Sequence, residues 1–544
     1  MRVGLIGCLL VLASGCKFPE LPPVEEGDDD GGPDADLNVP QPLAVTVTGE
    51  GSVTSNPPGI ACGSTCMADF DPLASVTLTP TPAATSVFEE WGGDCSGSGA
   101  CTVTMDGAKT VSARFAQHGA VRWVNHISFV ENESIDAIAV DGQGNVIVGG
   151  AVEPTGERDL FVAKYAPATG QVVWMRHLAT PSPAGYEAQF GGMVIDAAGD
   201  IYLATSLQGN GTAVTYDPGK TAIGDLFHNI VVMRLSGTDG AVVWVKQWGG
   251  GSVDKPIAIA VSGSDLYVTG TTSSNPSNFD GQTIAGQVNQ GFLLRASTAT
   301  GTVAQVRVLP GVIRSMVVNG NNLLLGGTMS GTFSDGVCGT SATASGTDGL
   351  VMMYTGTTLA CQWVKNFGSN TAGEDTVVSA VTSFANGSWL VGGTFEGSLS
   401  GLTPGGLGAN GMFDAFAVRF ALDGTHQWSF RYGGAGNEGI NAVTATPDGN
   451  AILAGNFTGE ITFGAHTVMG TNNVFVTRMS SSMTTPVHEW AVSLGGAESD
   501  SATAVGTAQD GSVFVNATFS GMTTVGATPL AAQSIDAWIT SLVR

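Results

Sequence analysis

The chain has 544 residues, enough for three or four domains, although one large β domain could take most of that length. Only 12% of the residues are charged and 78 are glycine, which argues against a helical bundle or a coiled coil, and 43% are hydrophobic, which excludes a disordered chain. The net charge of −26, with 20 Lys and Arg, leaves no basic face for nucleic-acid binding.

The first residues have the pattern of an export signal. After Met1 and Arg2 comes an apolar run too short to span a bilayer as a mature helix, so residues 1–15 are predicted to be a signal peptide. The run ends in Leu12–Cys16 (Leu-Ala-Ser-Gly-Cys), which resembles the lipobox of bacterial lipoproteins. The resemblance implies cleavage before Cys16 and its acylation, and several acyl chains anchor a protein stably. Lys17 is not the Asp associated with inner-membrane retention, so we expect the outer membrane. An ordinary secretory signal with a chance cysteine is the alternative.

Residues 16–42 are predicted to form a solvated tether. Residues 17–42 hold eight acidic residues, one lysine and six prolines, so this segment carries −7 of the net charge and cannot bury a core. Its Asp-rich part resembles a calcium-binding loop only loosely, because Val39 stands where an EF-hand has its bidentate Glu.

Residues 43–116 are predicted to form a small β module with two disulfides. Runs of alternating polar and apolar residues are separated by Gly and Pro, which is typical of half-buried strands. Four cysteines stand at Cys62, Cys66, Cys95 and Cys101, and an exported chain meets an oxidising compartment. Their spacing favours Cys62–Cys66 and Cys95–Cys101, although other pairings and a zinc site stay open.

The same segment resembles the divergent internalin-B-type bacterial repeat. The resemblance is carried by Gly49–Val53, Gly59–Gly63, Phe88–Gly97 and the closing Lys109–Phe115. Such repeats are spacers in surface proteins, and the resemblance implies no enzymatic activity.

A four-part unit recurs seven times between residues 117 and 544. Apolar first strands begin near residues 135, 190, 256, 312, 377, 440 and 501, and four strands per unit are the signature of a β-propeller. The seventh unit ends with a third strand at Asp536–Leu542, whereas Gly119–Trp123 reads as a fourth strand without the first three. The sequence therefore predicts an all-β chain: a seven-bladed β-propeller closed by its N-terminal strand and preceded by the small disulfide-bearing module.

The units resemble the bacterial SBBP-type β-propeller repeat. Its Trp and Gly-Gly lead-in is present in Trp244–Gly250, Trp428–Gly434 and Trp490–Gly496, whereas the third unit has Gln305 in place of the tryptophan. The resemblance implies the fold and no particular chemistry, because the family has no shared catalytic motif.

Two sets of residues recur once per unit. We expect the tryptophans to pack at the blade periphery, with stacking on sugars as the alternative. We expect the basic residues to pair with cross-strand acids, with an anion-binding ring as the alternative. The tryptophans are Trp123, Trp174, Trp244, Trp363, Trp428 and Trp490, and the basic residues are Lys164, Arg234, Arg295, Arg419 and Arg478.

Other reactive residues do not form a motif. Cys338 and Cys361 lie in one unit and favour a third disulfide, with two free thiols as the alternative. The seven histidines show no pair at i, i+4, and the sequence contains no Gly-x-Ser-x-Gly nucleophile elbow, so we predict no catalytic, cofactor or metal site.

These features predict a non-enzymatic, monomeric outer-membrane lipoprotein whose propeller is an interaction or adhesion scaffold for a protein or envelope partner. One alternative is a glycan-binding protein in envelope polysaccharide handling, which requires exposed aromatic residues on one propeller face. The other is a propeller enzyme of the lyase or dehydrogenase type. An enzyme requires polar side chains that converge at the channel mouth, whereas the first strands offer mostly Ala, Val and Ile.

Overall fold

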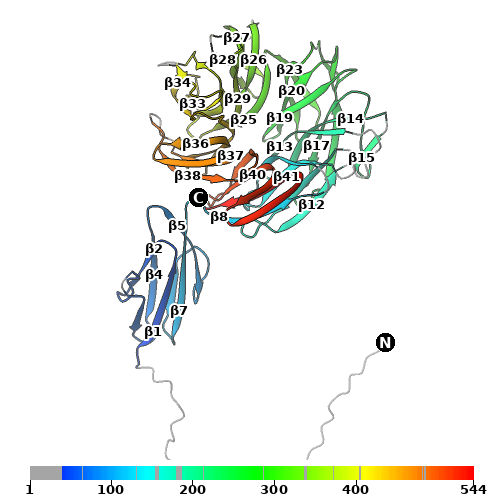
Figure 1. The fold of residues 1–544 in the computed structure, drawn as a ribbon. Helices are drawn as coiled ribbons and strands as arrows, with labels where there is room; N and C mark the ends of the chain where they lie inside the picture. The colour runs from blue at the N-terminus through cyan, green and yellow to red at the C-terminus, as the bar shows by residue number, and fades with distance from the viewer. Residues whose placement is uncertain are drawn as a thin grey trace, which may run out of the picture. The chain divides into compact units, whose positions relative to one another are not determined.

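The computed structural model describes residues 39–544 except 64, 130–131, 154–157, 179–186, 212, 286, 336–337, 339, 370, 372, 403–405, 481 and 483–484. The expected signal peptide, Cys16 and nearly all of the tether lie outside the described residues. The chain divides into two compact units, a small N-terminal module and a large ring (Figure 1). The described residues contain no helix of the length and hydropathy needed to cross a bilayer.

The small module consists of two packed sheets with strand orders β3-β1-β7-β5 and β2-β4-β6. Alternation decides which side chains are buried: Val111, Ala113 and Phe115 of β7 face the core, whereas Ser112 and Arg114 face solvent. Its strands are β1 (Gln41–Thr48), β2 (Gly51–Asn56), β3 (Met67–Phe70), β4 (Ser75–Pro82), β5 (Ser86–Gly93), β6 (Cys101–Thr104) and β7 (Lys109–Gln117).

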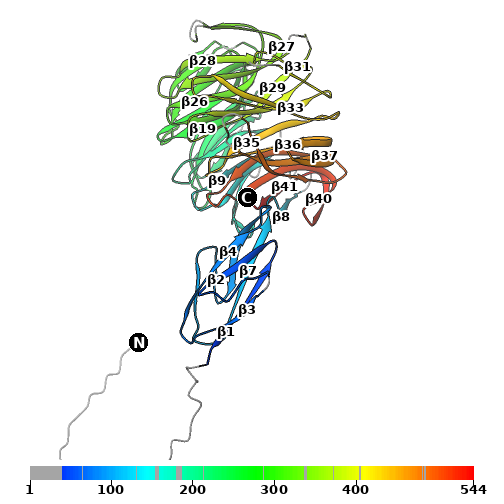
Figure 2. The same ribbon diagram turned by 90° about the vertical axis from the view of Figure 1, so that its left-hand side faces the viewer.

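The ring consists of seven four-stranded antiparallel sheets, as predicted (Figures 1 and 2). Blade 1 consists of β9 (Glu133–Val140), β10 (Val146–Val152), β11 (Asp159–Tyr165) and β12 (Val172–Leu178). Blade 2 consists of β13 (Glu187–Ile195), β14 (Ile201–Gln208), β17 (Asn229–Leu235) and β18 (Val242–Trp248). Blade 3 consists of β19 (Asp254–Ser262), β20 (Asp265–Thr272), β23 (Gln290–Ser297) and β24 (Val303–Leu309). Blades 4 and 5 are β25 (Val312–Asn319), β26 (Asn322–Asp335), β27 (Thr340–Thr355) and β28 (Ala360–Phe367); β29 (Thr376–Ser383), β30 (Trp389–Phe395), β33 (Asp414–Phe420) and β34 (His426–Tyr432). Blades 6 and 7 are β35 (Gly439–Ala445), β36 (Ala451–Phe463), β37 (His466–Met479) and β38 (His488–Leu494); β39 (Asp500–Thr507), β40 (Val513–Val525), β41 (Thr528–Leu542) and β8 (Val121–Ile127).

The connection between the second and third strands carries a short hairpin in three blades. These hairpins are β15 (Ala213–Asp217) with β16 (Lys220–Ile223), β21 (Ser277–Phe279) with β22 (Gln282–Ile284), and β31 (Ser398–Leu399) with β32 (Leu407–Gly408). Because every blade runs in the same direction, all second-to-third connections lie on one face of the ring, which we call the hairpin face.

Strand β8 closes the ring as the fourth strand of blade 7. It pairs with β41, with Trp538 opposite His126 and Thr540 opposite Val124, and lies beside β41 in both views (Figures 1 and 2). The first strands β39 and β9 are also neighbours, so the last blade meets the first as every other blade meets the next. The prediction of closure by the N-terminal strand is confirmed, and closure covers the sheet edge that would otherwise be exposed.

The middle strands are buried on both sides. Every residue of β10 and β33 is buried, because neighbouring blades cover both faces of each sheet. One apolar cluster joins Tyr202 and Val232 of blade 2 to Ile259 and Val268 of blade 3, so the blades are held together by a continuous apolar interior.

The repeated tryptophans fix each blade to the next. The indole nitrogen of Trp244 donates a hydrogen bond to the carbonyl of Thr298, 3.0 Å away in the turn between the third and fourth strands of blade 3. In the same turn Gly301, at φ +69°, lies under the ring, and a Cβ there would come within 2.9 Å of the indole. The same pairing of tryptophan with a positive-φ glycine is present in Trp123–Gly170, Trp174–Gly240, Trp363–Gly424 and, at the closure, Trp490–Gly119.

The junction of blades 3 and 4 departs from this pattern on both sides. Gln305 replaces the tryptophan, and its amide nitrogen donates to the carbonyl of Thr358 at 2.9 Å. The turn position filled by glycine at five other junctions is Leu359, fully buried and still at φ +47°. The smaller glutamine leaves room for a side chain in the turn, so the two replacements complement each other.

Candidate functional site

Each of the seven first strands contains one β-bulge. In every case one residue of the first strand is skipped in its pairing with the second. The skipped residues are Asp136, Gly191, Ile257, Arg314, Ser379, Asn441 and Thr503. First strands are neighbours around the ring axis, so these bulges form a ring of their own around the central channel.

The bulges change what the channel offers chemically. The first strands are mostly Ala, Val and Ile, but five of the seven skipped residues are polar or charged. A bulge interrupts the alternation of inward and outward side chains, so a strand that reads as apolar can still present a polar residue to the channel. The signal in the sequence was a single polar residue within an apolar run, as in Ile135-Asp136-Ala137.

A cavity of about 270 Å³ lies in the channel and is lined by both Asp136 and Arg314. Apolar side chains of β13, β19 and β25 complete its wall, among them Phe190, Ile257 and Met316. Two other polar bulge residues are engaged in the fold, because Asn441 donates to the carbonyl of Ala502 at 2.9 Å and Thr503 donates to that of Ile135. The carboxylate of Asp136 and the guanidinium of Arg314 are therefore the charged groups of the cavity lining that a ligand could contact.

A second repeated motif was not predicted from the sequence, although its pattern is present there. It consists of Gly-Gly followed, after three residues, by an acidic residue. Asp254, Glu438 and Asp500 accept hydrogen bonds from the backbone N–H of Gly250, Gly434 and Gly496 at 2.8, 3.1 and 3.0 Å. The acid thereby fixes the turn that connects one blade to the next.

Opposite Asp254 and Glu438 lies the first residue of the preceding blade's third strand. A Cβ on Gly249 would lie 2.5 Å from Asn229 Oδ1 and 2.6 Å from Asp254 Oδ2, so this junction pairs an amide with an acid. At the corresponding junction of blades 5 and 6, a Cβ on Gly433 would lie 2.6 Å from Asp414 Oδ1 and 2.7 Å from Glu438 Oε2. Here two carboxyl groups meet.

The carboxyl pair Asp414–Glu438 is buried, with exposed fractions of 0% and 2%. Asp414 Oδ2 is held by Arg431 at 3.0 Å and by the N–H of Asn410 at 2.9 Å, whereas Asp414 Oδ1 and Glu438 Oε1 have no hydrogen-bond partner. Burial, with a smaller contribution from the charge of Asp414, raises the pKa of Glu438 to about 7. A proton on Glu438 therefore relieves the repulsion between the two groups.

Glu438→Gln is expected to stabilise the protein at pH 8 and not at pH 5. Folding takes up a proton on Glu438 between its unfolded pKa of 4.5 and about 7, so its stabilisation is complete below pH 4.5 and is lost as the pH rises through 7. The amide can accept from Gly434 and donate to Asp414 at any pH, as in the junctions with an asparagine. Urea unfolding should show a gain at pH 8 of up to about 3 kcal/mol.

The control is Glu460→Gln, an exposed acid on β36, which should change stability equally at both pH values. His488, whose pKa burial lowers to about 4, imposes the opposite pH dependence on wild type and variants alike, so it cancels in the comparison. An equal effect of Glu438→Gln at pH 5 and pH 8 would contradict the shared-proton description.

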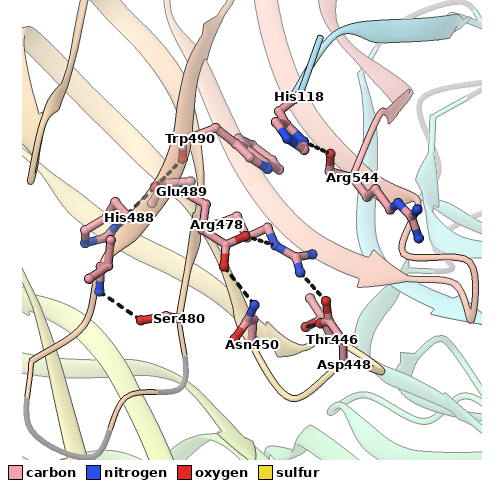
Figure 3. A network of polar contacts seen from close by, with 12 residues as sticks. His118, Thr446, Asp448, Asn450, Arg478, Ser480, His488, Glu489, Trp490 and Arg544 are labelled. Atoms are coloured by element: carbon pink, nitrogen blue, oxygen red, sulfur yellow. Dashed lines mark hydrogen bonds and ion pairs between the residues drawn. The ribbon is translucent and has the colours of Figure 1, made fainter. Parts of the chain in front are cut away.

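The repeated basic residues do not form an anion-binding ring. Lys164, Arg234 and Arg295 pair with Asp141, Asp200 and Asp265 of the turns between first and second strands. Arg478 pairs with Asp448 and with Glu489, which also accepts from Asn450 (Figure 3). Arg419 is buried, donates to Ser388 Oγ at 2.7 Å and stacks on Phe384. The expectation of cross-strand acids is confirmed at four of the five positions.

The histidines are dispersed over the fold. His488 is buried between Thr477 and Tyr432, and His126 pairs with Asp536 at 2.7 Å. His118 contacts the backbone carbonyl of Arg544 (Figure 3). The remaining four, His177, His228, His426 and His466, lie in three other blades and in blade 6. In the described part of the chain no three His, Cys, Asp or Glu side chains are placed to hold a metal ion.

The cysteines form the pairs that their spacing favoured. The module contains Cys62–Cys66 and Cys95–Cys101, and blade 4 contains Cys338–Cys361. The first two each close a short loop in a unit with a small core, the kind of domain in which disulfides are common. The third joins the connection before β27 to the outer strand β28.

Residues 41–119 match the family model of the divergent InlB B-repeat domain. Among solved structures, the WD40 domain of Pan2 from Neurospora crassa has a TM-score of 0.40 at 9% identity, over 78% of this chain and 97% of that one. A protein of unknown function from Dyadobacter fermentans has a TM-score of 0.38 at 11% identity, over 78% and 99% of the two chains.

The quinohemoprotein alcohol dehydrogenase from Comamonas testosteroni has a TM-score of 0.36 at 9% identity, over 77% of this chain and 76% of that one. Scores and identities this low carry no argument about function. A search of curated proteins found no match. The chain thus combines a divergent InlB B-repeat domain with a β-propeller whose blades are defined by its own strand pairing.

Proposed function

We propose that the chain is a non-enzymatic lipoprotein of the outer membrane, anchored through Cys16, whose SBBP-type propeller binds a protein partner with its hairpin face. The lipobox-like Leu12–Cys16 and the acidic tether supply the argument for the anchor, and the InlB-type module acts as a spacer.

The single observation that carries the binding function is the exposure of large apolar side chains on the hairpin face. Leu226, Val288, Met469 and Met522 are 74%, 84%, 72% and 69% exposed and belong to four different blades. Leu226 and Val288 lie between the second and third strands, whereas Met469 and Met522 lie in the paired ends of these strands, next to the hairpin turn. Phe227 and Met412 add to the set. Exposed apolar residues that recur on one face are typical of a protein-binding surface, and methionine adapts readily to a partner.

Charge adds to the chemistry of this face. Met469 lies directly opposite the exposed Glu460 in the β36–β37 hairpin, and the side chain of Glu498 lies beside Gly521, next to Met522. Apolar groups next to acids suit a partner surface with apolar side chains flanked by Lys or Arg. The partner we propose is therefore a protein with a basic binding surface.

Glycan binding is less well supported. None of the tryptophans and tyrosines among the described residues is exposed, and the repeated tryptophans are used between blades. A sugar-binding face needs aromatic rings that are accessible to the ligand.

The proposal is tested by site-specific photo-crosslinking in intact cells. A photoreactive amino acid at position 469 or 522 should give the same discrete protein adduct, whereas one at position 173, on the exposed outer edge of blade 1, should not. Adducts at 469 should be lost in Met522→Gln, and the band should yield a protein with a basic surface. Absence of an adduct at 469 and 522, or equal labelling at 173, would overturn the binding face.

The same cells test the anchor. Palmitate labelling should depend on Cys16 and be abolished by Cys16→Ser, with the protein leaving the membrane fraction. Unchanged labelling in that variant would overturn the lipid anchor.

A further inference from the structure

The channel cavity contains two opposite charges that the fold does not pair with each other. Asp136 of β9 and Arg314 of β25 are the charged residues of its lining, and both are exposed to solvent in the channel. No ion pair joins them among the contacts of the described residues, and the strands that carry them belong to blades 1 and 4. A gap therefore remains between the carboxylate and the guanidinium.

Asp136 is oriented but not neutralised. Ser134 donates a hydrogen bond to its Oδ2 at 2.9 Å, which fixes the carboxyl group from its own strand. The surrounding protein raises the pKa of Asp136, and Ser134 and the charge of Arg158 offset this only in part. Because no ion pair to Asp136 is present among the described residues, the site favours a ligand with a positive charge next to this carboxylate.

The wall between the two charges is apolar. Phe190, Met193, Ile257, Ile259 and Met316 contribute to the lining. Gly191 and Gly192 allow β13 to pack closely on β19, because a Cβ on Gly192 would come within 3.2 Å of Ile259. A side chain at Gly191 would meet the carbonyl oxygen of Pro256 at 2.6 Å, so these glycines keep the two strands that line the cavity side by side.

We propose that this cavity binds a free α-amino acid with an apolar side chain. The guanidinium of Arg314 matches a carboxylate with its fork of N–H donors, and the carboxylate of Asp136 accepts from an ammonium group. The apolar wall receives the side chain, and a volume of about 270 Å³ limits the ligand to a small molecule. This site is separate from the apolar residues of the hairpin face.

The bulges place this site toward the hairpin face. Asp136 and Arg314 are the fourth and third residues of β9 and β25, and first strands begin at the end of the blade where second strands finish. The ligand therefore enters from the side on which the partner is proposed to bind.

The test is calorimetric titration of the chain from residue 17 onward with L-leucine. Wild type should bind, and Asp136→Asn and Arg314→Gln should each weaken binding at least tenfold. Ser379→Ala, at a bulge position outside the cavity lining, is the matched control and should bind as wild type does. Thermal unfolding of each variant checks that the fold is kept, since both side chains are exposed to solvent.

Two analogues separate the roles. 4-Methylpentanoate, which lacks the ammonium group, should bind weakly and be insensitive to Asp136→Asn while still depending on Arg314. Leucinamide, which lacks the carboxylate, should show the reverse. Absence of binding by leucine, methionine and phenylalanine at millimolar concentration, or equal binding by wild type and both variants, would overturn the proposal. Neither result bears on crosslinking at residues 469 and 522, so the two proposals fail independently.

Discussion

Trp244→Ala is expected to lower the free energy of unfolding of the ring by about 3–5 kcal/mol. The indole is 9% exposed, packs within the apolar cluster between blades 2 and 3, and donates to the carbonyl of Thr298. Truncation leaves a cavity at the junction and an unpaired carbonyl. Urea unfolding should show the loss, and Val243→Thr, at the neighbouring exposed position, should change stability by no more than about 0.5 kcal/mol.

The junction of blades 3 and 4, where Gln305 replaces the tryptophan, allows a more specific test of these contacts. Gln305→Trp alone should destabilise the ring, because the indole would meet the buried side chain of Leu359 where five other junctions have glycine. Leu359→Gly alone should destabilise it as well, by emptying that space. The double variant should recover at least about 1 kcal/mol relative to the sum of the two single effects. Additive effects would show that the two positions do not compensate each other.

A chain that begins at residue 129, and so lacks β8, is expected to be at least about 3 kcal/mol less stable than one that begins at residue 118. Without β8, the edge of β41 is exposed together with the apolar cluster of blade 7 that Val121 and Val124 help to cover. An exposed edge pairs with other chains, so the shorter protein should also self-associate.

Calorimetry and light scattering measure both effects. A peptide of residues 119–129 added in trans should restore the melting temperature and the monomer, because it can supply the missing strand. Equal stability and a monomeric state without the peptide would mean that closure contributes little.

The sequence predicts the blades well because each unit repeats the same local pattern. Four runs of apolar or alternating residues recur seven times, and the unmatched strand at each end, Gly119–Trp123 and Asp536–Leu542, indicates how the ring closes. The cysteine pairs are equally local, since two of them close loops of a few residues.

The channel site could not be predicted in the same way. Whether Asp136 lies in the channel depends on the register of β9 with β10, because the bulge leaves this residue without a partner in the strand pairing. That Arg314 lines the same cavity depends on the closure of the ring, which brings together residues 178 positions apart. Similarly, the high pKa of Glu438 comes from burial, with a smaller contribution from Asp414 of the preceding blade, and neither residue alone carries that signal.

The tryptophan–glycine contacts have a consequence for exchanging blades between propellers. At five of the seven junctions one blade contributes the tryptophan and the next contributes the glycine, so the two sides of a blade must match two different neighbours. Blade 4, which presents Leu359 on one side and Trp363 on the other, fits only between a neighbour with glutamine and one with glycine. A graft of this single blade into another propeller would thus create two mismatched junctions. A graft whose ends lie within blades would transfer each junction with both of its partners and would create no mismatch.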